Sequence, residues 1–216
     1  MRIFIGHDSR HKQASKVCKQ SILNYWPDAD ITYLDKAKLK EIGMYGRKDV
    51  DGESTEFSFT RFYVPLICNY EGIAMFCDND FLWKCDPRKL RKYINKKPLA
   101  VVKHEDYDVI EDKMDGVKNK AYPKKNWSSL MIFRCNQFKN KLNKEYLDNA
   151  TPAQLHEFHF INENNISSIP KEYNCLVGHY DCENAKALHY TNGGPWFDEY
   201  KYSEHANEWW KVYNSL

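Results

Sequence analysis

Two aspartates one residue apart follow an apolar run in the stretch GIAMFCDNDFLWKCDP, residues 72–87. Asp78 and Asp80 offer hard carboxylate oxygens, the ligands that suit Mg²⁺ or Mn²⁺ bridging two phosphates. In an extended chain the two carboxylates would lie about 6–7 Å apart, too far to bind one ion unless the chain turns between them. The pattern therefore leaves two interpretations open, a metal ligand with a second water or substrate contact, or two solvated aspartates before the helix near Pro87.

The same D-x-D spacing occurs at three other places, Asp28/Asp30, Asp49/Asp51 and Asp106/Asp108. Context separates them, because ligands of an open α/β sheet bind outside the carboxyl ends of its strands. Asp78 and Asp80 directly follow a predicted strand. The 106/108 pair follows another predicted strand by a few residues, so it is the one competitor.

Two further segments hold candidate ligands at predicted strand ends. In ALHYTNGGPWF, His189 follows an apolar stretch and precedes a turn with Gly193 and Gly194, where backbone N–H groups can approach a phosphate. In IFIGHDSR, the first strand ends at Gly6, followed by His7 and Asp8. The alternatives are a hydrogen-bonded core histidine, and an Asp8 or Ser9 that caps the next helix. No dinucleotide fingerprint or P-loop motif is present.

The elements that must position these residues alternate between strand and helix along the chain. Apolar runs predict strands at 2–6, 31–34, 72–77, 98–104, 128–135 and 187–191, and helical intervals predict a helix over 58–70 with Pro65 inside it. This order predicts an α/β fold with a mostly parallel central sheet. We expect a single domain over 1–216, either the whole protein or one domain of a longer chain. The long polar segment 104–128 is expected to be functional.

Composition excludes several classes of protein. The formal charge is +2, from 32 basic and 30 acidic residues, whereas nucleic-acid binders usually carry a strong basic excess. No apolar run approaches the roughly 20 residues of a membrane helix, and the first segment is too short for a signal peptide. The seven scattered cysteines favour reduced buried thiols over a disulfide frame or zinc site. We therefore expect a cytoplasmic protein.

Five motifs spread over positions 3 to 197 occur together in an order that has a known counterpart, namely IFIGHDSR, STEFSFTRF, MFCDND, YPKKNWSS and HYTNGGPWF. With them the chain resembles GT-A-fold glycosyltransferases that use nucleotide sugars. It is most similar to the small single-domain type of bacteria and large viruses, with a glycogenin-like general pattern. The resemblance implies a Rossmann-like fold with a mostly parallel sheet flanked by helices, and transfer of a sugar from a UDP-sugar to a glycan or other hydroxyl acceptor.

The resemblance also implies a role for each matching residue. Asp80 and His189 would bind a Mn²⁺ or Mg²⁺ ion, and Asp78 would contact the ion, its water or the ribose. The other implied nucleotide contacts are Gly6, His7 and Asp8 for uracil and ribose, Asn79 beside Asp78, Arg61 for the nucleotide or pyrophosphate, and Gly193 and Gly194 for the diphosphate.

One position departs from the glycogenin-like pattern. That pattern has a lysine before the Pro-Trp pair, which neutralises the leaving diphosphate, and here Gly194 stands in its place. Lys124, Lys125 or Arg61 would have to supply the charge, or the metal would neutralise more of it, and the retaining stereochemistry of that group is not carried over. If the reaction inverts, a carboxylate base is needed near the acceptor hydroxyl, and Asp115 is the candidate. Its alternative is an ordinary turn residue.

Rival classes fit the sequence less well. A phosphatase of the haloacid dehalogenase type has Thr or Val where Leu82 stands. It also needs a later acidic pair for Mg²⁺, and this chain contains no adjacent Asp-Asp. A sugar-nucleotide nucleotidyltransferase usually opens with a glycine- and basic-rich loop, which is absent. A non-catalytic carbohydrate-binding domain remains the non-enzymatic alternative.

Overall fold

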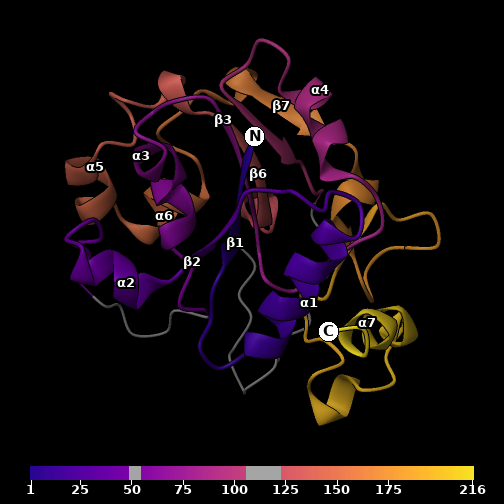
Figure 1. The fold of residues 1–216 in the computed structure, drawn as a ribbon. Helices are drawn as coiled ribbons and strands as arrows, with labels where there is room; N and C mark the ends of the chain where they lie inside the picture. The colour runs from indigo at the N-terminus through magenta and orange to yellow at the C-terminus, as the bar shows by residue number, and fades with distance from the viewer. Residues whose placement is uncertain (49–54, 106–122) are drawn as a thin grey trace.

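The computed structural model describes residues 1–48, 55–105 and 123–216. Within these residues a six-stranded sheet forms the centre of the molecule, with helices on both faces (Figure 1). Its strand order is β2-β1-β3-β6-β5-β7. The strands are β1 (Arg2–Gly6), β2 (Ile31–Leu34), β3 (Ile73–Cys77), β5 (Leu99–Val102), β6 (Leu130–Arg134) and β7 (Ile166–Ile169).

The sheet is parallel except at one strand. β1 pairs in parallel with both β2 and β3, and β5 pairs in parallel with β7. β6 lies between β3 and β5 and is antiparallel to both. The predicted fold class, an α/β fold of the GT-A type with a mostly parallel sheet flanked by helices, is therefore confirmed.

The helices divide between the two faces of this sheet (Figure 1). One side carries α2, α3, α5 and α6, and the other carries α1, α4 and α7. Their bounds are α1 (Lys12–Leu23), α2 (Lys36–Glu41), α3 (Val64–Ile67), α4 (Arg91–Ile94), α5 (Lys144–Asn149), α6 (Pro152–His156) and α7 (Ala206–Tyr213). The 3₁₀ turns are η1 (Thr60–Tyr63), η2 (Pro87–Leu90), η4 (Trp127–Ser129), η5 (Cys135–Gln137), η6 (Glu163–Asn165), η7 (Lys171–Asn174) and η8 (Asp198–Tyr200).

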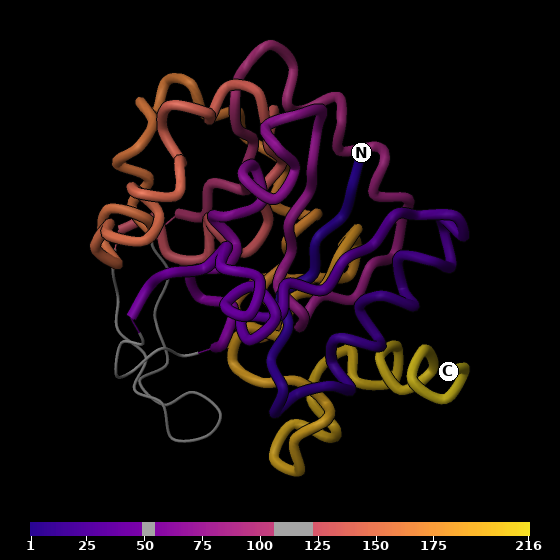
Figure 2. Tube along the Cα trace, turned by 60° about the vertical axis from the view of Figure 1, so that its left-hand side comes forward, coloured from indigo at the N-terminus to yellow at the C-terminus, as the bar shows by residue number. Residues whose placement is uncertain are grey.

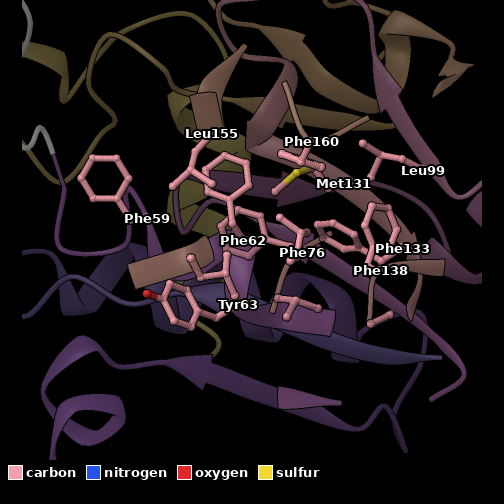
Figure 3. Close-up of a cluster of buried hydrophobic side chains, with 14 of the residues drawn as sticks. Phe59, Phe62, Tyr63, Phe76, Leu99, Met131, Phe133, Phe138, Leu155 and Phe160 are labelled. Atoms are coloured by element: carbon pink, nitrogen blue, oxygen red, sulfur yellow. The ribbon is translucent and has the colours of Figure 1, made fainter. Parts of the chain in front are cut away.

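The continuous apolar runs of the strands are explained by burial on both faces. Successive side chains point to opposite sides, so Phe4 joins one core cluster while Ile3 and Ile5 join the other. Figure 3 shows the first cluster, in which Phe62 of η1 and Phe138 meet Phe76, Phe133 and other side chains of the sheet. The second cluster packs the opposite face against α1, η2 and α4.

A second, smaller sheet lies beside the main one. Among the described residues it has three strands in the order β4-β9-β8, formed by β4 (Phe81–Trp83), β8 (Cys175–Leu176) and β9 (Ala187–His189). The C-terminal helix α7 runs next to α1 in both views (Figure 2). Trp209 of α7 packs with Val17 of α1 and Leu188 of β9 in a third core cluster.

The predicted helix over 58–70 is present in modified form. Residues 60–63 form the 3₁₀ turn η1, and α3 follows at once with Pro65 in its first turn. Proline is tolerated there because the first N–H groups of a helix have no partner within the helix.

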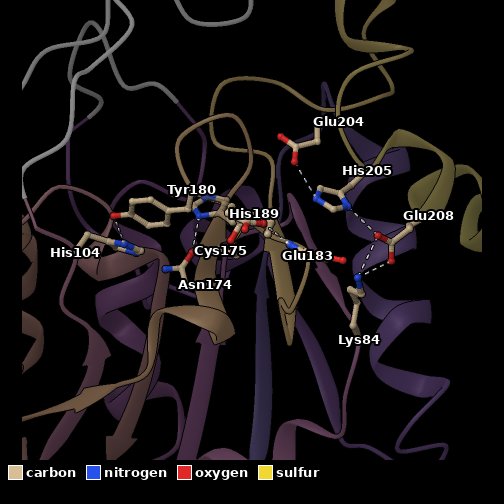
Figure 4. The surroundings of a disulfide bond; sticks show 12 residues. Lys84, His104, Asn174, Cys175, Tyr180, Glu183, His189, Glu204, His205 and Glu208 are labelled. Atoms are coloured by element: carbon tan, nitrogen blue, oxygen red, sulfur yellow. Dashed lines mark hydrogen bonds and ion pairs between the residues drawn. A yellow bond between two sulfur atoms is a disulfide. The ribbon is translucent and has the colours of Figure 1, made fainter.

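The cysteine prediction is correct for most positions and wrong for one pair. Within the described chain, five buried cysteines are free thiols, namely Cys18, Cys68, Cys77, Cys85 and Cys135. Cys175 and Cys182, however, form a disulfide across the loop that follows β8 (Figure 4). Scattered spacing in the sequence does not reveal such a pair, because the fold brings the two Cα atoms to 5.8 Å. Among the described residues no helix is long and apolar enough to cross a membrane.

Candidate metal and nucleotide site

The structure brings Asp78, Asp80 and His189 together at the carboxyl end of β3. Each side chain offers one oxygen or nitrogen atom, and these atoms all lie within 4.8 Å of one another. Residues 79 and 80 form a turn directly after β3, which removes the separation expected of an extended chain. Two carboxylates and an imidazole are a donor set that suits a divalent cation. The group could therefore bind a metal ion.

The turn between β3 and β4 and the pairing of β4 with β9 explain why Asp80 reaches His189. β4 pairs with β9 so that Phe81 lies opposite His189, and their rings stack with centroids 4.5 Å apart. The Tyr190 backbone N–H donates to the Asp80 carbonyl at 3.1 Å. As a result, His189 Nε2 lies 3.3 Å from Asp80 Oδ1, and both residues are more than nine-tenths buried.

Asp78 is held from the other side by Arg61. The Arg61 guanidinium lies 3.0 Å from Asp78 Oδ1, and the two side chains are 7% and 14% exposed. It also donates to the Phe57 carbonyl and to the carbonyl and hydroxyl oxygens of Ser128. Arg61 is itself buried, as are all four residues of η1. Arg61 therefore anchors Asp78 from within the core, while its predicted contact with the nucleotide stays a prediction.

His189 is held by a chain of buried polar groups on its other ring nitrogen. His189 Nδ1 lies 2.7 Å from Asn174 Oδ1, and Asn174 Nδ2 donates to Ser129 Oγ at 2.8 Å. The Ser129 hydroxyl donates in turn to the Asn126 carbonyl at 2.7 Å. Figure 4 shows Asn174 beside His189, with His104 and Tyr180 near the same edge. Metal-binding histidines usually have such a partner on the second nitrogen.

A cavity of about 480 Å³ opens at the carboxyl ends of β1 and β2, lined by His7, Ser9, Lys12, Asp35, Lys36, Ala37, Lys40 and Glu56. Its size falls in the range of small-molecule sites. Because β1 is the neighbour of β3 in the sheet, the cavity and the Asp78–Asp80–His189 group lie along one edge. His7 Nδ1 is buried there without a hydrogen-bond partner among the described residues.

Three predicted nucleotide contacts are engaged with other parts of the chain. A Cβ added to Gly6 would lie 2.5 Å from the Phe57 ring, so glycine is required for packing there. Asp8 binds Arg10 and accepts from the Glu56 backbone N–H at 3.3 Å. Burial by itself would raise the pKa of Asp8, but the hydrogen bonds and charge of Arg10 hold it below its ordinary value. Asn79 is buried and donates to Ser15 Oγ at 3.4 Å.

The alternative that Asp8 or Ser9 caps α1 is wrong. The N-cap residue is His11, which makes no side-chain cap hydrogen bond, while both Ser9 N and Ser9 Oγ donate to Glu56.

The two glycines after His189 are also explained by packing. A Cβ on Gly193 would lie 2.5 Å from the Tyr200 ring, and Gly193 has a φ of +139°, which few other residues adopt. A Cβ on Gly194 would lie 2.0 Å from the Trp196 ring. A lysine at position 194 would therefore require the Trp196 ring to move. The approach of Gly193 and Gly194 to a diphosphate stays a prediction.

The structure describes the two predicted lysines but not the candidate catalytic base. Lys124 Nζ donates to the Glu157 carbonyl at 3.1 Å and lies 3.3 Å from Glu163. Lys125 is buried at 8% exposure. Asp115, the candidate base, lies outside the described residues, as do Asp49/Asp51 and Asp106/Asp108.

Residues that sequence reasoning did not single out support the site. Asn174, Ser128 and Ser129 contact its ligands or their anchors, and only the serines carried a signal, as part of the YPKKNWSS motif. His104 follows β5 and lies 3.1 Å from the Tyr180 hydroxyl. Burial, together with nearby His189, lowers the pKa of His104 to about 3, so its imidazole is neutral at physiological pH.

Solved structures share this fold across nearly the whole chain. The bifunctional glycosyltransferase WbbM matches 99% of this chain with a TM-score of 0.69 at 14% identity, and the chain covers 49% of that protein. The galactosyltransferase LgtC, solved with donor and acceptor sugar analogues, matches 100% of this chain and 96% of its own, with a TM-score of 0.62 at 11% identity. GlyE of Streptococcus pneumoniae matches 98% of this chain and 60% of its own, with a TM-score of 0.62 at 13% identity. These likenesses establish the fold.

Sequence comparison identifies a relative. No protein-family model matches the chain. Protein CDI of Arabidopsis thaliana is 41% identical over 217 residues, which covers 96% of this chain and 84% of that protein. The chain thus belongs to the same protein family as Protein CDI, and it has the fold of GT-A glycosyltransferases.

Proposed function

We propose that this protein is a metal-dependent glycosyltransferase that moves a sugar from a UDP-sugar donor to a glycan or other hydroxyl acceptor. The observation that carries the proposal is the convergence of Asp78, Asp80 and His189 at the carboxyl end of β3 in a GT-A fold. The ion would be Mn²⁺ or Mg²⁺. The cytoplasm is the proposed location.

Some residues of the site would bind the metal ion and others the nucleotide. Asp78, Asp80 and His189 would hold the ion, which as a Lewis acid stabilises the charge of the leaving diphosphate when bound. The nucleoside would occupy the cavity beside β1 and β2, where His7 Nδ1 can hydrogen-bond a base or ribose. The protein otherwise holds donor and acceptor in reacting geometry.

Other contacts belong to the same proposal. Asp8, Asn79 and the backbone of Gly6 would line the nucleotide side, and Gly193 and Gly194 would lie near the diphosphate. Positive charge for the leaving group would come from Lys124, Lys125 or Arg61. Asp115 would be the base if the reaction inverts.

A donor screen tests the function directly. The protein is incubated with Mn²⁺, a panel of UDP-sugars and GDP-sugars, and hydroxyl acceptors, and nucleotide release is measured. Metal-dependent release of UDP supports a transferase. Binding of sugar without nucleotide or metal, measured by calorimetry, would instead indicate a carbohydrate-binding domain. Pyrophosphate release from UTP and a sugar phosphate would indicate a nucleotidyltransferase.

The Asp80→Asn variant tests the metal site. It keeps the size of the side chain but removes the anionic ligand, so metal-dependent UDP binding should fall by at least about tenfold while the fold is kept. Asp28→Asn is the matched control, because Asp28 belongs to another D-x-D pair and is exposed. Calorimetry with UDP and Mn²⁺ measures both variants. Equal UDP–Mn²⁺ affinity of Asp80→Asn and wild type would place the site elsewhere.

A further inference from the structure

A chain of hydrogen bonds runs from a backbone carbonyl to the imidazole of His189. It links Asn126, Ser129, Asn174 and His189 through contacts of 2.7, 2.8 and 2.7 Å. The last three residues are at most 1% exposed. In such a buried network each donor must meet an acceptor, because an unpaired polar group is costly away from water.

The direction of every bond in this chain follows from its first member. The Asn126 carbonyl can only accept, so the Ser129 hydroxyl donates to it. The Ser129 oxygen then accepts from Asn174, which fixes the amide with Nδ2 toward Ser129 and Oδ1 toward His189. An amide oxygen only accepts, so a neutral His189 carries its proton on Nδ1. Its lone pair is left on Nε2, the nitrogen 3.3 Å from Asp80 Oδ1.

The opposite tautomer has a ready partner, which is why the choice matters. With its proton on Nε2, neutral His189 would donate to the Asp80 carboxylate, and that nitrogen would have no lone pair for a metal ion. We infer that Asn174 is a positioning residue that holds His189 in the tautomer able to bind a metal, with Ser129 fixing the orientation of the Asn174 amide. The inference rests on the proposed metal site.

The surrounding fold holds the residues of this hydrogen-bond chain in place. Asn174 ends η7 and directly precedes Cys175, whose disulfide to Cys182 closes the following loop. β8 pairs with β9 so that Leu176 lies opposite His189. Asn126 also donates through Nδ2 to Thr191 Oγ1 at 3.2 Å, which ties the other end to the segment after His189. One end of this hydrogen-bond chain is therefore fixed to β9, which carries His189, and the other end to the segment that follows β9.

The tautomer can be read directly by nitrogen NMR of metal-free protein at about pH 8, where an ordinary imidazole is neutral. In wild type, His189 should show its proton on Nδ1 and a bare Nε2. Asn174→Leu, of similar shape without an acceptor, should shift it to the Nε2–H form. Asn174→Asp loses the donor to Ser129 but restores an acceptor toward His189, so it should restore the proton on Nδ1. A wild-type His189 protonated on Nε2 would overturn the inference without any variant.

Two adjacent serines supply a matched pair of controls. Ser129→Ala frees the Asn174 amide to turn and should give a mixture of tautomers. Ser128→Ala removes the hydroxyl contacts with Arg61 and His156 and should leave His189 unchanged. Both serines are at most 3% exposed, so the two variants lose similar buried groups. If both serine variants change the tautomer equally, the effect is general loosening and the inference is wrong.

Binding of Mn²⁺ alone, measured by calorimetry, is the second readout. Partners of metal-binding histidines typically change metal affinity by about 10–100-fold, so Asn174→Leu should weaken Mn²⁺ binding by that factor while Asn174→Asp keeps it. Failure of wild type to bind Mn²⁺ would refute the proposed metal site, although the tautomer would still be measured. Wild-type Mn²⁺ affinity in Asn174→Leu would refute the role of Asn174 alone.

Discussion

Arg61→Met removes the cation that faces Asp78 inside the core. The methionine keeps an unbranched apolar chain between the Phe57 and Phe76 rings, which lie 5.3 and 5.1 Å from the guanidinium carbon. The lost groups are the ion pair with Asp78 and the hydrogen bonds to Phe57 and Ser128. In the absence of metal, Asp78 is then left as a buried carboxylate without this cation.

The expected loss of stability follows from the burial of the pair. Both side chains are at least 86% buried, given exposures of 7% and 14%, so solvent screens them little. Removing one partner of a buried pair costs about 3–5 kcal/mol of unfolding free energy. For a chain of this length, that lowers the melting temperature by roughly 6–20 °C.

Thermal and urea unfolding of metal-free protein measure this loss. Arg88→Met is the matched control, because Arg88 forms a similar pair with Asp86 on the surface and should leave the melting temperature nearly unchanged. The double variant Arg61→Met/Asp78→Asn removes the carboxylate charge that Arg61 no longer faces and should regain at least about 1 kcal/mol. UDP–Mn²⁺ affinity of the folded variant then tests the predicted nucleotide contact separately.

A stability loss below about 1 kcal/mol in Arg61→Met would refute this reasoning, since it would mean that Asp78 is well solvated without its partner. The same conclusion would follow if Asp78→Asn lowered the unfolding free energy of Arg61→Met as much as it lowers that of wild type.

The other two predictions concern the disulfide and a buried histidine. Cys182→Ser opens the loop from Cys175 and should lower the unfolding free energy by about 2.5 kcal/mol in the chain-entropy model, with the same loss on adding reductant to wild type; equal stability of reduced and oxidised protein would contradict it. Burial, with the nearby Arg61 and Arg47 charges, lowers the pKa of His156 to about 3. His156 therefore takes up a proton on unfolding when the pH is below about 6.5. Its contribution to the unfolding free energy is complete above that pH and falls by about 1.4 kcal/mol per pH unit toward pH 3. Urea denaturation of both proteins between pH 4 and 7 should give a smaller slope of unfolding free energy against pH in His156→Gln than in wild type. An unchanged slope would contradict the prediction.

The sheet could be predicted from sequence because its strands have a simple physical signature. Strands covered on both faces read as continuous apolar runs, as in residues 72–77, and the structure confirms this strand as β3. The direction of a strand has no such signature. Nothing in residues 128–135 indicates that β6 runs antiparallel between β3 and β5, since orientation depends on partners distant in the chain.

Asp78 and Asp80 could be predicted because they directly follow a strand that ends at the carboxyl edge of the central sheet, and they converge there with His189. His189 ends a strand of the second sheet, so only the family resemblance connected it with the two aspartates. The supporting residues of the site could not be predicted, because their partners lie far away in sequence. Arg61 meets Ser128 across 67 positions and Asn174 meets Ser129 across 45, and no local pattern encodes such pairs.

The antiparallel direction of β6 explains how one short segment can support the candidate ligands Asp78 and His189, which lie on different segments. Because β6 runs against β3, its first residues lie where β3 ends, and the Asp78 backbone N–H donates to the Ser129 carbonyl at 2.9 Å. Adjacent serines of η4 then face in two directions. Ser128 binds Arg61, which holds Asp78, and Ser129 binds Asn174, which contacts His189. A parallel strand in this place would bring its last residues to the edge, so residues 126–129 would lie at the opposite end of the sheet from both ligands. Among the described strands of the central sheet, the one that departs from the parallel pattern is therefore also the one that places the support for the candidate site.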